Sequence, residues 1–153
     1  MHRPSHQPRG GPPDGRHERL RLDLTVLVLV STAEALTTGA RFHYDPADPL
    51  AVHMEFPGTP EPSPPWALSR DVLYAGLRAP SGEGGVRVWP PCRCHGTTTV
   101  RILLRGRHAT AVLYVPAAEL RDWLDATFTA VPAGTEGTHL RWDDVLDRIR
   151  RSR

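Results

Sequence analysis

The stretch RDVLYAGLRAPSGEGGVRVWP, residues 70–90, combines a helix start, a glycine-rich turn and a strand. Ser69 directly before it is a favoured N-cap residue, because its hydroxyl accepts a hydrogen bond from a free backbone N–H of the first turn. Pro80 cannot continue a helix. The stretch therefore predicts a short helix over 70–77. The glycine run at 81–85 then turns the chain into the strand VRVWP.

Upstream, RLRLDLTVLVLV at 19–30 alternates between apolar and polar residues. The even-numbered leucines and valines share one face, and arginine, aspartate and threonine occupy the first half of the other face. This alternation predicts a β-strand with one buried face. Leu27 and Leu29 make the end of the second face apolar too, so we expect that end to be covered.

Short strands are expected next at 40–44 and 50–56, separated by the turn sequence DPADP. The proline-rich segment PGTPEPSPP at 57–65 predicts a loop, and a brief strand at 66–68 then leads into the short helix. These strands precede the helix in the chain and are joined by a turn and a proline-rich loop.

Two further strands are predicted downstream, at about 97–105 and 109–115, with RGRH at 105–108 as their hairpin loop. A helix opening at Pro116 and another over about 139–150 each have an apolar stripe, which must lie on a sheet face or a neighbouring subunit. The stripes are Leu120, Trp123, Leu124 and Thr127 in the first helix, and Trp142, Val145, Leu146 and Ile149 in the second.

This order of elements predicts an α+β domain over residues 19–150. It has mainly antiparallel β-sheets, one short inserted helix and two C-terminal helices. The preceding residues, 1–18, are rich in Pro, Gly, His and Arg and contain almost nothing to bury, so we expect a disordered tail. The tail is either an adhesive arm for a partner or polyanion, or an inert extension.

The composition favours a globular domain without a membrane segment. The chain has 153 residues, of which 39% are apolar and 24% charged, and this suits one domain with a core. The net charge of +2 does not by itself indicate a nucleic-acid partner. The longest strongly apolar run, VLVLV at 26–30, is far shorter than the roughly 20 residues of a membrane helix. The first 20 residues contain no hydrophobic segment, so we expect a cytoplasmic protein without direct membrane insertion.

Three runs in the chain resemble a known family. YDPADPLAVHMEF at 44–56 precedes the stretch at 70–90, and VPAGTE at 131–136 follows it. Their order and spacing resemble the SsgA-like proteins of spore-forming actinobacteria over most of residues 20–149. The matching residues in the first two runs and just before the second are Tyr44, Asp45, Asp48, Pro49, Ala51, Val52, His53, Trp66, Arg70, Asp71, Leu73, Gly76, Leu77, Pro80, Gly82, Gly84, Val86, Arg87, Val88, Trp89 and Pro90.

The resemblance implies a fold like that of the whirly single-stranded nucleic-acid binders, and a homo-oligomer such as a trimer. It also implies a non-enzymatic regulator or adaptor of sporulation-specific cell division, acting in septum-site selection and septal wall organisation. Its partners would be other SsgA-like proteins or division-ring components such as the tubulin-like FtsZ, with recruitment to the septum. Gly85 stands where the family is expected to have an aspartate, and the tail and proline-rich loop are also unusual, which suggests a divergent paralogue.

No catalytic or cofactor-binding pattern is present in the sequence. We find no GxGxxG, P-loop, GxSxG or HExxH motif. His53 is expected on the polar side of its strand, and the neighbouring Asp143 and Asp144 point about 100° apart on a helix, a poor arrangement for shared acid–base chemistry. We therefore expect no enzyme activity and no cofactor.

Cys92, Cys94 and His95 offer three potential metal ligands at cramped spacing, whereas a structural zinc site usually has four. In a strand, residues two apart lie about 6.5–7 Å from each other, at or beyond the usual limit for a disulfide. We expect two reduced thiols and no metal.

The alternation in VRVWP places Arg87 and Trp89 on one face, opposite the two valines. Tryptophan and arginine are typical anchors of protein interfaces, so this pair is a candidate partner-binding site. The alternative is a sheet covered on both sides, with Trp89 in the core.

Arg101 and Arg105 share a strand face and form a candidate basic face, with Arg93 and Arg107 nearby in sequence. Such a row can follow phosphates, which makes a single-stranded nucleic-acid-binding module the alternative function. No aromatic residue for base stacking lies between 93 and 113, so a solvated face that protects a sheet edge is favoured. A third hypothesis is a remnant paralogue without an active role.

Overall fold

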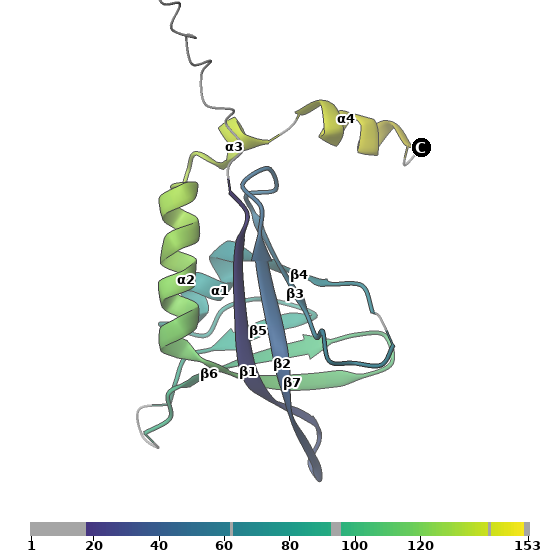
Figure 1. Ribbon diagram of the computed structural model, residues 1–153, viewed down its shortest axis with the longest axis vertical. Helices are drawn as coiled ribbons and strands as arrows, with labels where there is room; N and C mark the ends of the chain where they lie inside the picture. Colours follow the sequence, from purple (N-terminus) through teal and green to yellow (C-terminus); the bar gives the residue numbers. More distant parts are fainter. Residues whose placement is uncertain (1–17, 62, 93–95, 141, 152–153) are drawn as a thin grey trace, which may run out of the picture.

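β1 (Leu20–Ser31) is the middle strand of a seven-stranded antiparallel sheet with the order β4-β3-β2-β1-β7-β6-β5 (Figure 1). The computed structural model describes residues 18–61, 63–92, 96–140 and 142–151. The other strands are β2 (Glu34–Tyr44), β3 (Ala51–Glu55), β4 (Trp66–Ser69), β5 (Val86–Trp89), β6 (Thr99–Arg105) and β7 (Thr110–Pro116). The helices are α1 (Arg70–Gly76), α2 (Ala117–Ala130), α3 (Glu136–His139) and α4 (Trp142–Arg151).

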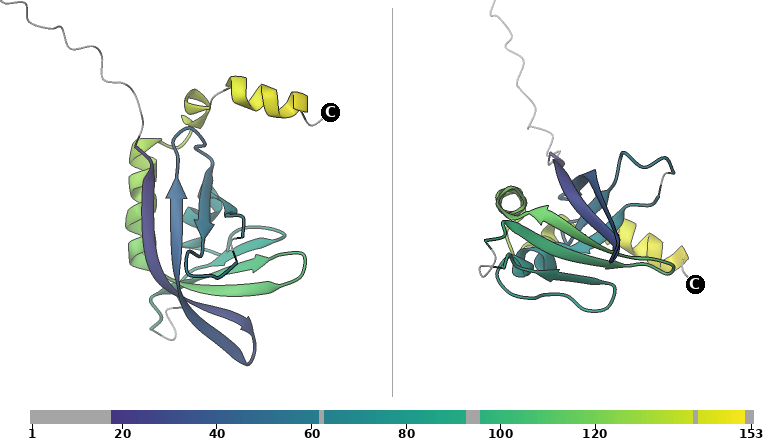
Figure 2. Two further views of the ribbon diagram at one scale, coloured as in Figure 1. Left: turned by 45° about the vertical axis from the view of Figure 1, so that its right-hand side comes forward. Right: turned by 90° about the horizontal axis from the view of Figure 1, so that it is seen from below.

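The sheet bends sharply between β1 and β7. β1 pairs with β2 along almost its whole length, but with β7 only from Leu27 to Leu29. Strands β1–β4 therefore run steeply across β5–β7, and the two halves enclose one core in a near-barrel (Figures 1 and 2). The largest fully buried apolar side chains of the strands are Tyr44, Phe42, Met54, Leu68, Ile102, Leu113, Val26 and Val52.

α1 begins where the capping pattern predicts. The Ser69 hydroxyl accepts a hydrogen bond from the backbone N–H of Val72 at 3.2 Å. The helix ends at Gly76, which lies against Val88 of β5 so closely that a Cβ there would overlap the valine side chain. This contact joins the inserted helix to the edge strand that follows it.

α2 runs beside β1 on the core side of the sheet and closes one end of the core (Figures 1 and 2). Its predicted stripe is buried in full, and the Trp123 ring lies 6.1 Å from the Phe42 ring. The expected antiparallel α+β architecture, with one inserted helix and C-terminal helices, is thus confirmed.

Several details differ from the prediction. The second strand begins at Glu34 and is longer than the expected segment 40–44. The last helix is α4, preceded by the separate four-residue α3, instead of one helix over 139–150. Its stripe is covered by none of the described residues, since Trp142, Leu146 and Ile149 are 58%, 45% and 57% exposed.

The expected cover over the end of the first strand is also absent among the described residues. Leu27 on the outer face is 39% exposed, and Val30 on the inner face is 43% exposed. The buried face of β1 therefore ends at Val28, because the last residues of the strand extend beyond the core.

No described helix is both long and apolar enough to cross a membrane. The expected disordered tail falls, except for Glu18, outside the described residues.

Candidate protein-binding surface

The strand registers bring distant residues into one row on the outside of the sheet. Trp89 of β5 lies opposite Arg101 of β6, which lies opposite Tyr114 of β7. Tyr114 lies opposite Leu27 of β1, and Leu27 lies opposite Thr37 of β2. Successive side chains of a strand point to opposite faces, so this row points away from the core. It crosses β5, β6, β7, β1 and β2.

A second row lies beside the first, two residues along each strand. It consists of Arg87, Leu103, Val112, Leu29 and Ala35. We refer to the two rows together as the outer face. The centre of the outer face is apolar and consists of Leu29, Leu103 and Val112. The described residues leave each of these side chains only half-buried.

Trp89 lies between two arginines of the outer face. The guanidinium carbon of Arg87 is 5.6 Å from the centre of the Trp89 ring, and that of Arg101 is 5.7 Å from it. A cation within about 6 Å of an indole face is attracted by the ring quadrupole. Trp89 is half-buried by these neighbours and is not a core residue, so the candidate partner-binding pair and the first residue of the candidate basic face form one cluster.

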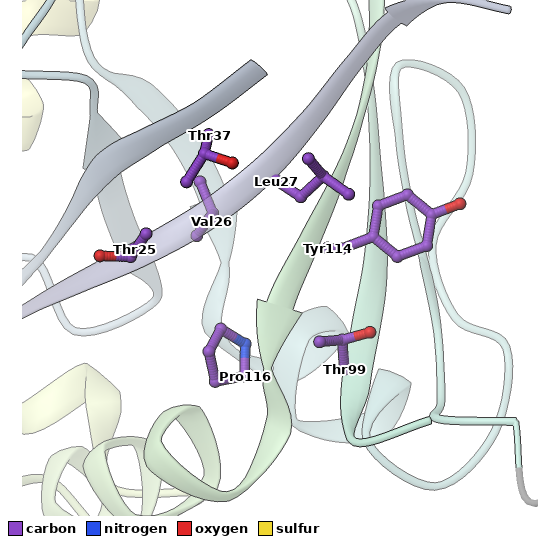
Figure 3. Close-up of a pocket in the computed structure, with 7 residues that line it drawn as sticks. All are labelled: Thr25, Val26, Leu27, Thr37, Thr99, Tyr114 and Pro116. Atoms are coloured by element: carbon purple, nitrogen blue, oxygen red, sulfur yellow. The ribbon is translucent and has the colours of Figure 1, made fainter. Parts of the chain in front are cut away.

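An open pocket of about 360 Å³ lies in the outer surface where β1 and β7 separate (Figure 3). The side chains of Leu27 and Tyr114 stand side by side at one end of it, and Thr37 comes from the neighbouring strand. Pairing between β1 and β7 stops at Leu27, which leaves room between Thr25 and Pro116. The outer face therefore includes a recess beside its aromatic row.

Arg105 lies on the same face of β6 as Arg101 and is exposed at the end of the strand. The sequence offered no aromatic residue near these arginines, but cross-strand pairing places Trp89 on one side of Arg101 and Tyr114 on the other. Two aromatic side chains are therefore neighbours of Arg101 across the sheet, although none is near it along the chain.

The outer side of β1–β3 has a different character, because paired charges cover it. Asp23 accepts hydrogen bonds from Arg21 at 2.7 Å and Arg41 at 2.8 Å, and these bonds, with that from Arg41 the larger influence, hold the Asp23 pKa below its usual range. Glu55 bonds His43 at 3.1 Å, which is the main reason for the lowered Glu55 pKa. The charged side chains described on this half of the surface therefore already have partners within the chain.

His53 of β3 lies opposite His43, a member of this charged network. Its Nε2 is 3.9 Å from a carboxylate oxygen of Asp48, and its side chain is partly exposed. This agrees with the expected place of His53 on the polar side of its strand.

The described residues contain no cluster of three or more His, Cys, Asp or Glu side chains that could hold a metal ion. Cys92 is a half-buried thiol. Cys94, His95 and Arg93 lie outside the described residues, so the expectation for the CxCH run is not tested.

The runs that resemble a known family meet at Arg70, whose side chain is buried. Its Nη1 donates hydrogen bonds to the Tyr44 hydroxyl at 2.9 Å, the Thr127 carbonyl at 3.1 Å and the Val131 carbonyl at 2.9 Å. Its Nη2 bonds the Glu136 carboxylate at 3.0 Å. The three matched runs contain Tyr44, Arg70, Val131 and Glu136. These runs therefore supply the hydrogen bonds that hold the elements together at Arg70.

The family model described as "Streptomyces sporulation and cell division protein, SsgA" matches residues 38–136. The chain belongs to this family. Among curated relatives, the sporulation-specific cell division protein SsgB of Streptomyces coelicolor is 41% identical over 127 residues, covering 83% of this chain and 92% of the relative. SsgB of Salinispora tropica is 32% identical over 136 residues, covering 88% and 94%.

Two solved structures share the fold. The structure of SsgB, described in connection with longitudinal cell division during sporulation of Streptomyces coelicolor, has a TM-score of 0.72 and 40% identity, covering 80% of this chain and 96% of that one. An SsgA-like sporulation-specific cell division protein from Thermobifida fusca has a TM-score of 0.74 and 25% identity, covering 88% and 98%. The family resemblance read from the three runs is thus confirmed.

Proposed function

We propose that this protein is a non-enzymatic adaptor of sporulation-specific cell division, which acts in septum-site selection and septal wall organisation by binding a protein partner through the outer face. The part in sporulation division rests on its relatives, which are named sporulation-specific cell division proteins. The adaptor mechanism rests on the row formed by Trp89, Arg101, Tyr114 and Leu27.

The composition of the outer face suits a protein partner. Tryptophan, tyrosine and arginine are enriched where protein interfaces bind most strongly, and charged residues are depleted from the centres of such interfaces. Here the arginines flank Trp89 at one end of the face, and aliphatic side chains occupy its middle. The partner is another SsgA-like protein or a division-ring component such as FtsZ, and binding recruits this cytoplasmic protein to the septum.

A fluorescent fusion in the sporulating actinobacterial host tests this function. The wild type should form bands or foci at nascent septa, and a Leu27→Ser/Trp89→Ala variant should be diffuse, because it loses the apolar centre and the aromatic anchor of the outer face. Arg21→Ala, in the charged half of the same sheet surface, is the matched control and should localise like the wild type. Both purified variants should first be shown to melt within a few degrees of the wild type.

Two results would contradict the proposal. Diffuse wild-type signal throughout septation would reject an adaptor role at septa. Septal bands formed by the outer-face variant would remove this surface as the docking site. If deletion of the gene changes nothing and no partner is recovered, the remnant-paralogue hypothesis is favoured.

A single-stranded nucleic acid is the second candidate partner, because the aromatic row alternates with an arginine. Stacking of bases on aromatic side chains and salt-dependent phosphate contacts would follow from that arrangement. We rank it second because Leu27, Leu29 and Leu103 continue the face with aliphatic groups that do not stack on bases. Binding of labelled oligonucleotides that weakens with salt and is lost in Trp89→Ala would reverse this order.

A further inference from the structure

Three arginines on the outer side of β5 and β6 have no acidic partner within the described part of the chain. Arg87, Arg101 and Arg105 are exposed, and none of them forms an ion pair with another described residue. Neither row of the outer face contains an aspartate or a glutamate. The charged half of the surface differs, because its arginines bond carboxylates of the same chain. We refer to the three unpaired arginines as the arginine cluster.

The arginine cluster surrounds Trp89. Arg87 and Arg101 are diagonal neighbours across the two strands, because Arg87 lies opposite Leu103 and Arg101 lies opposite Trp89. Arg105 lies beyond Leu103 on β6, roughly 13 Å from Arg101 at about 3.3 Å per residue. Like charges on neighbouring strands repel each other, so the cluster is unfavourable in the free protein. An anion bound between the arginines would relieve this repulsion.

Their place beside Trp89 prepares two of these arginines to bind carboxylates. The guanidinium carbons of Arg87 and Arg101 lie 5.6 and 5.7 Å from the ring centre, and attraction to the ring limits where both groups lie. A guanidinium presents its N–H donors in a planar fork, which binds a carboxylate through two parallel hydrogen bonds. A peptide segment with two acidic side chains can therefore pair with both arginines.

The recess between β1 and β7 can receive an apolar side chain of the same segment. Trp89 and Leu27 lie in one row, three strand spacings apart, which is roughly 14 Å at about 4.8 Å per spacing. Four residues of extended chain span roughly 13 Å. The recess lies beside Leu27 and Tyr114, is open to the outer surface and has a mainly apolar lining (Figure 3). An apolar residue about four positions from the carboxylates would therefore reach it.

We propose that the outer face binds an acidic segment of its partner protein, with carboxylates on the arginine cluster and an apolar side chain in the recess. The proposal rests on the adaptor function, because it gives the chemistry of the partner that the outer face receives. Opposite charges across an interface speed association and select against partners of the wrong sign. A protein segment fits better than a nucleic acid, because aliphatic side chains and not further cations continue the face from the cluster.

Peptide selection on the purified full-length protein tests this proposal. A library of short random peptides is selected on the wild type and, in parallel, on the charge-removed variant Arg87→Gln/Arg101→Gln. Peptides enriched only on the wild type should contain at least two Asp or Glu residues and an apolar residue about four positions away. Enrichment of neutral or basic peptides, or of none over the charge-removed variant, would overturn the proposal.

Fluorescence polarisation of a selected peptide measures the contribution of the charges. The charge-removed variant should bind it at least about 10-fold more weakly and melt like the wild type, because both side chains are exposed. Arg19→Gln/Arg21→Gln is the matched control, since it removes the same net charge at the start of β1 and should bind like the wild type. Replacing the acidic residues of the peptide by their amides should lose the same affinity. Equal binding by both double variants would contradict the proposal.

Failure of this proposal is distinguishable from failure of the adaptor function. In the sporulating host, the charge-removed variant should lose septal bands, as should Leu27→Ser/Trp89→Ala. Septal bands in the charge-removed variant alone would keep the docking surface but overturn the acidic segment. Diffuse wild-type signal would reject the adaptor role itself, whereas selected acidic peptides would still support the cluster as their binding site.

A nucleic acid is the remaining anionic ligand, and the same proteins test it. A labelled oligothymidylate should bind more weakly than the selected acidic peptides and should not displace them. An oligothymidylate that binds more tightly than every selected peptide, with binding lost in the charge-removed variant, would reassign the arginine cluster to nucleic acid and overturn the proposal.

Discussion

At the scale of single residues, Arg70 is the most connected side chain of the core. It is 1% exposed, donates four hydrogen bonds, and its guanidinium carbon lies 4.0 Å from the centre of the Phe128 ring. Only its Nε lacks a partner among the described atoms. One side chain thus ties β2, α1, α2 and α3 together.

Arg70→Met should destabilise the protein by about 3–5 kcal/mol, because it leaves the Glu136 carboxylate without its cation and removes the donor that Arg70 supplies to the Val131 carbonyl. Urea denaturation at neutral pH measures the change. Arg78→Met is the control, since Arg78 is exposed just beyond the same helix and should change stability by no more than about 0.5 kcal/mol. Equal midpoints for both variants would show that the Arg70 network does not stabilise the fold.

Glu136 gives stability a pH dependence. Hydrogen bonds from its own backbone N–H, and next from Arg70, lower its pKa below the ordinary 4.5. The folded state therefore favours the carboxylate. This contribution is fully present above the unfolded pKa and is lost as the pH falls through the lower folded value. The free-energy difference between wild type and Glu136→Gln should thus shrink between about pH 5 and pH 3. Urea melts across that range measure it, and a constant difference would contradict the assignment.

At the scale of elements, the contact between α1 and β5 depends on the absence of a side chain at Gly76. Gly76→Ala should cost about 1–3 kcal/mol, because its Cβ would overlap Val88 and push the helix from the strand. Gly137→Ala is the control, since nothing lies within 4 Å of the place its Cβ would occupy. Thermal melts of both variants measure the difference in stability. A Gly76→Ala variant as stable as Gly137→Ala would mean that α1 shifts without cost.

Elements whose signal is local were predictable from the sequence. The capping residue Ser69 predicts the start of α1, and the alternation of apolar residues from Leu20 to Val28 predicts β1. The first part of β2, EALTTG at 34–39, was missed because it is almost wholly exposed and has no apolar alternation. Its strand conformation comes from pairing with β1, which the sequence of β2 does not encode.

The candidate surface was half predictable for the same reason. Alternation placed Arg87 and Trp89 on one face, but Tyr114 and Leu27 join them only through the registers of β6, β7 and β1. The antiparallel order of strands far apart in the chain is a property of the whole core. The periodicity of one segment therefore cannot reveal which side chains will be neighbours across the sheet.

At the scale of the whole molecule, the folding core and the C-terminal arm are separate. The last core residue is Val131, and α3 and α4 bury no residue. A change in the C-terminal arm is therefore expected to leave the folding core intact.

Deleting residues 141–153 should leave the melting temperature at low concentration unchanged, because the deletion keeps the Arg70–Glu136 pair and every core residue. Differential scanning calorimetry at low protein concentration measures the change. A truncated protein that melts well below the wild type at low concentration would show that α4 packs on its own chain.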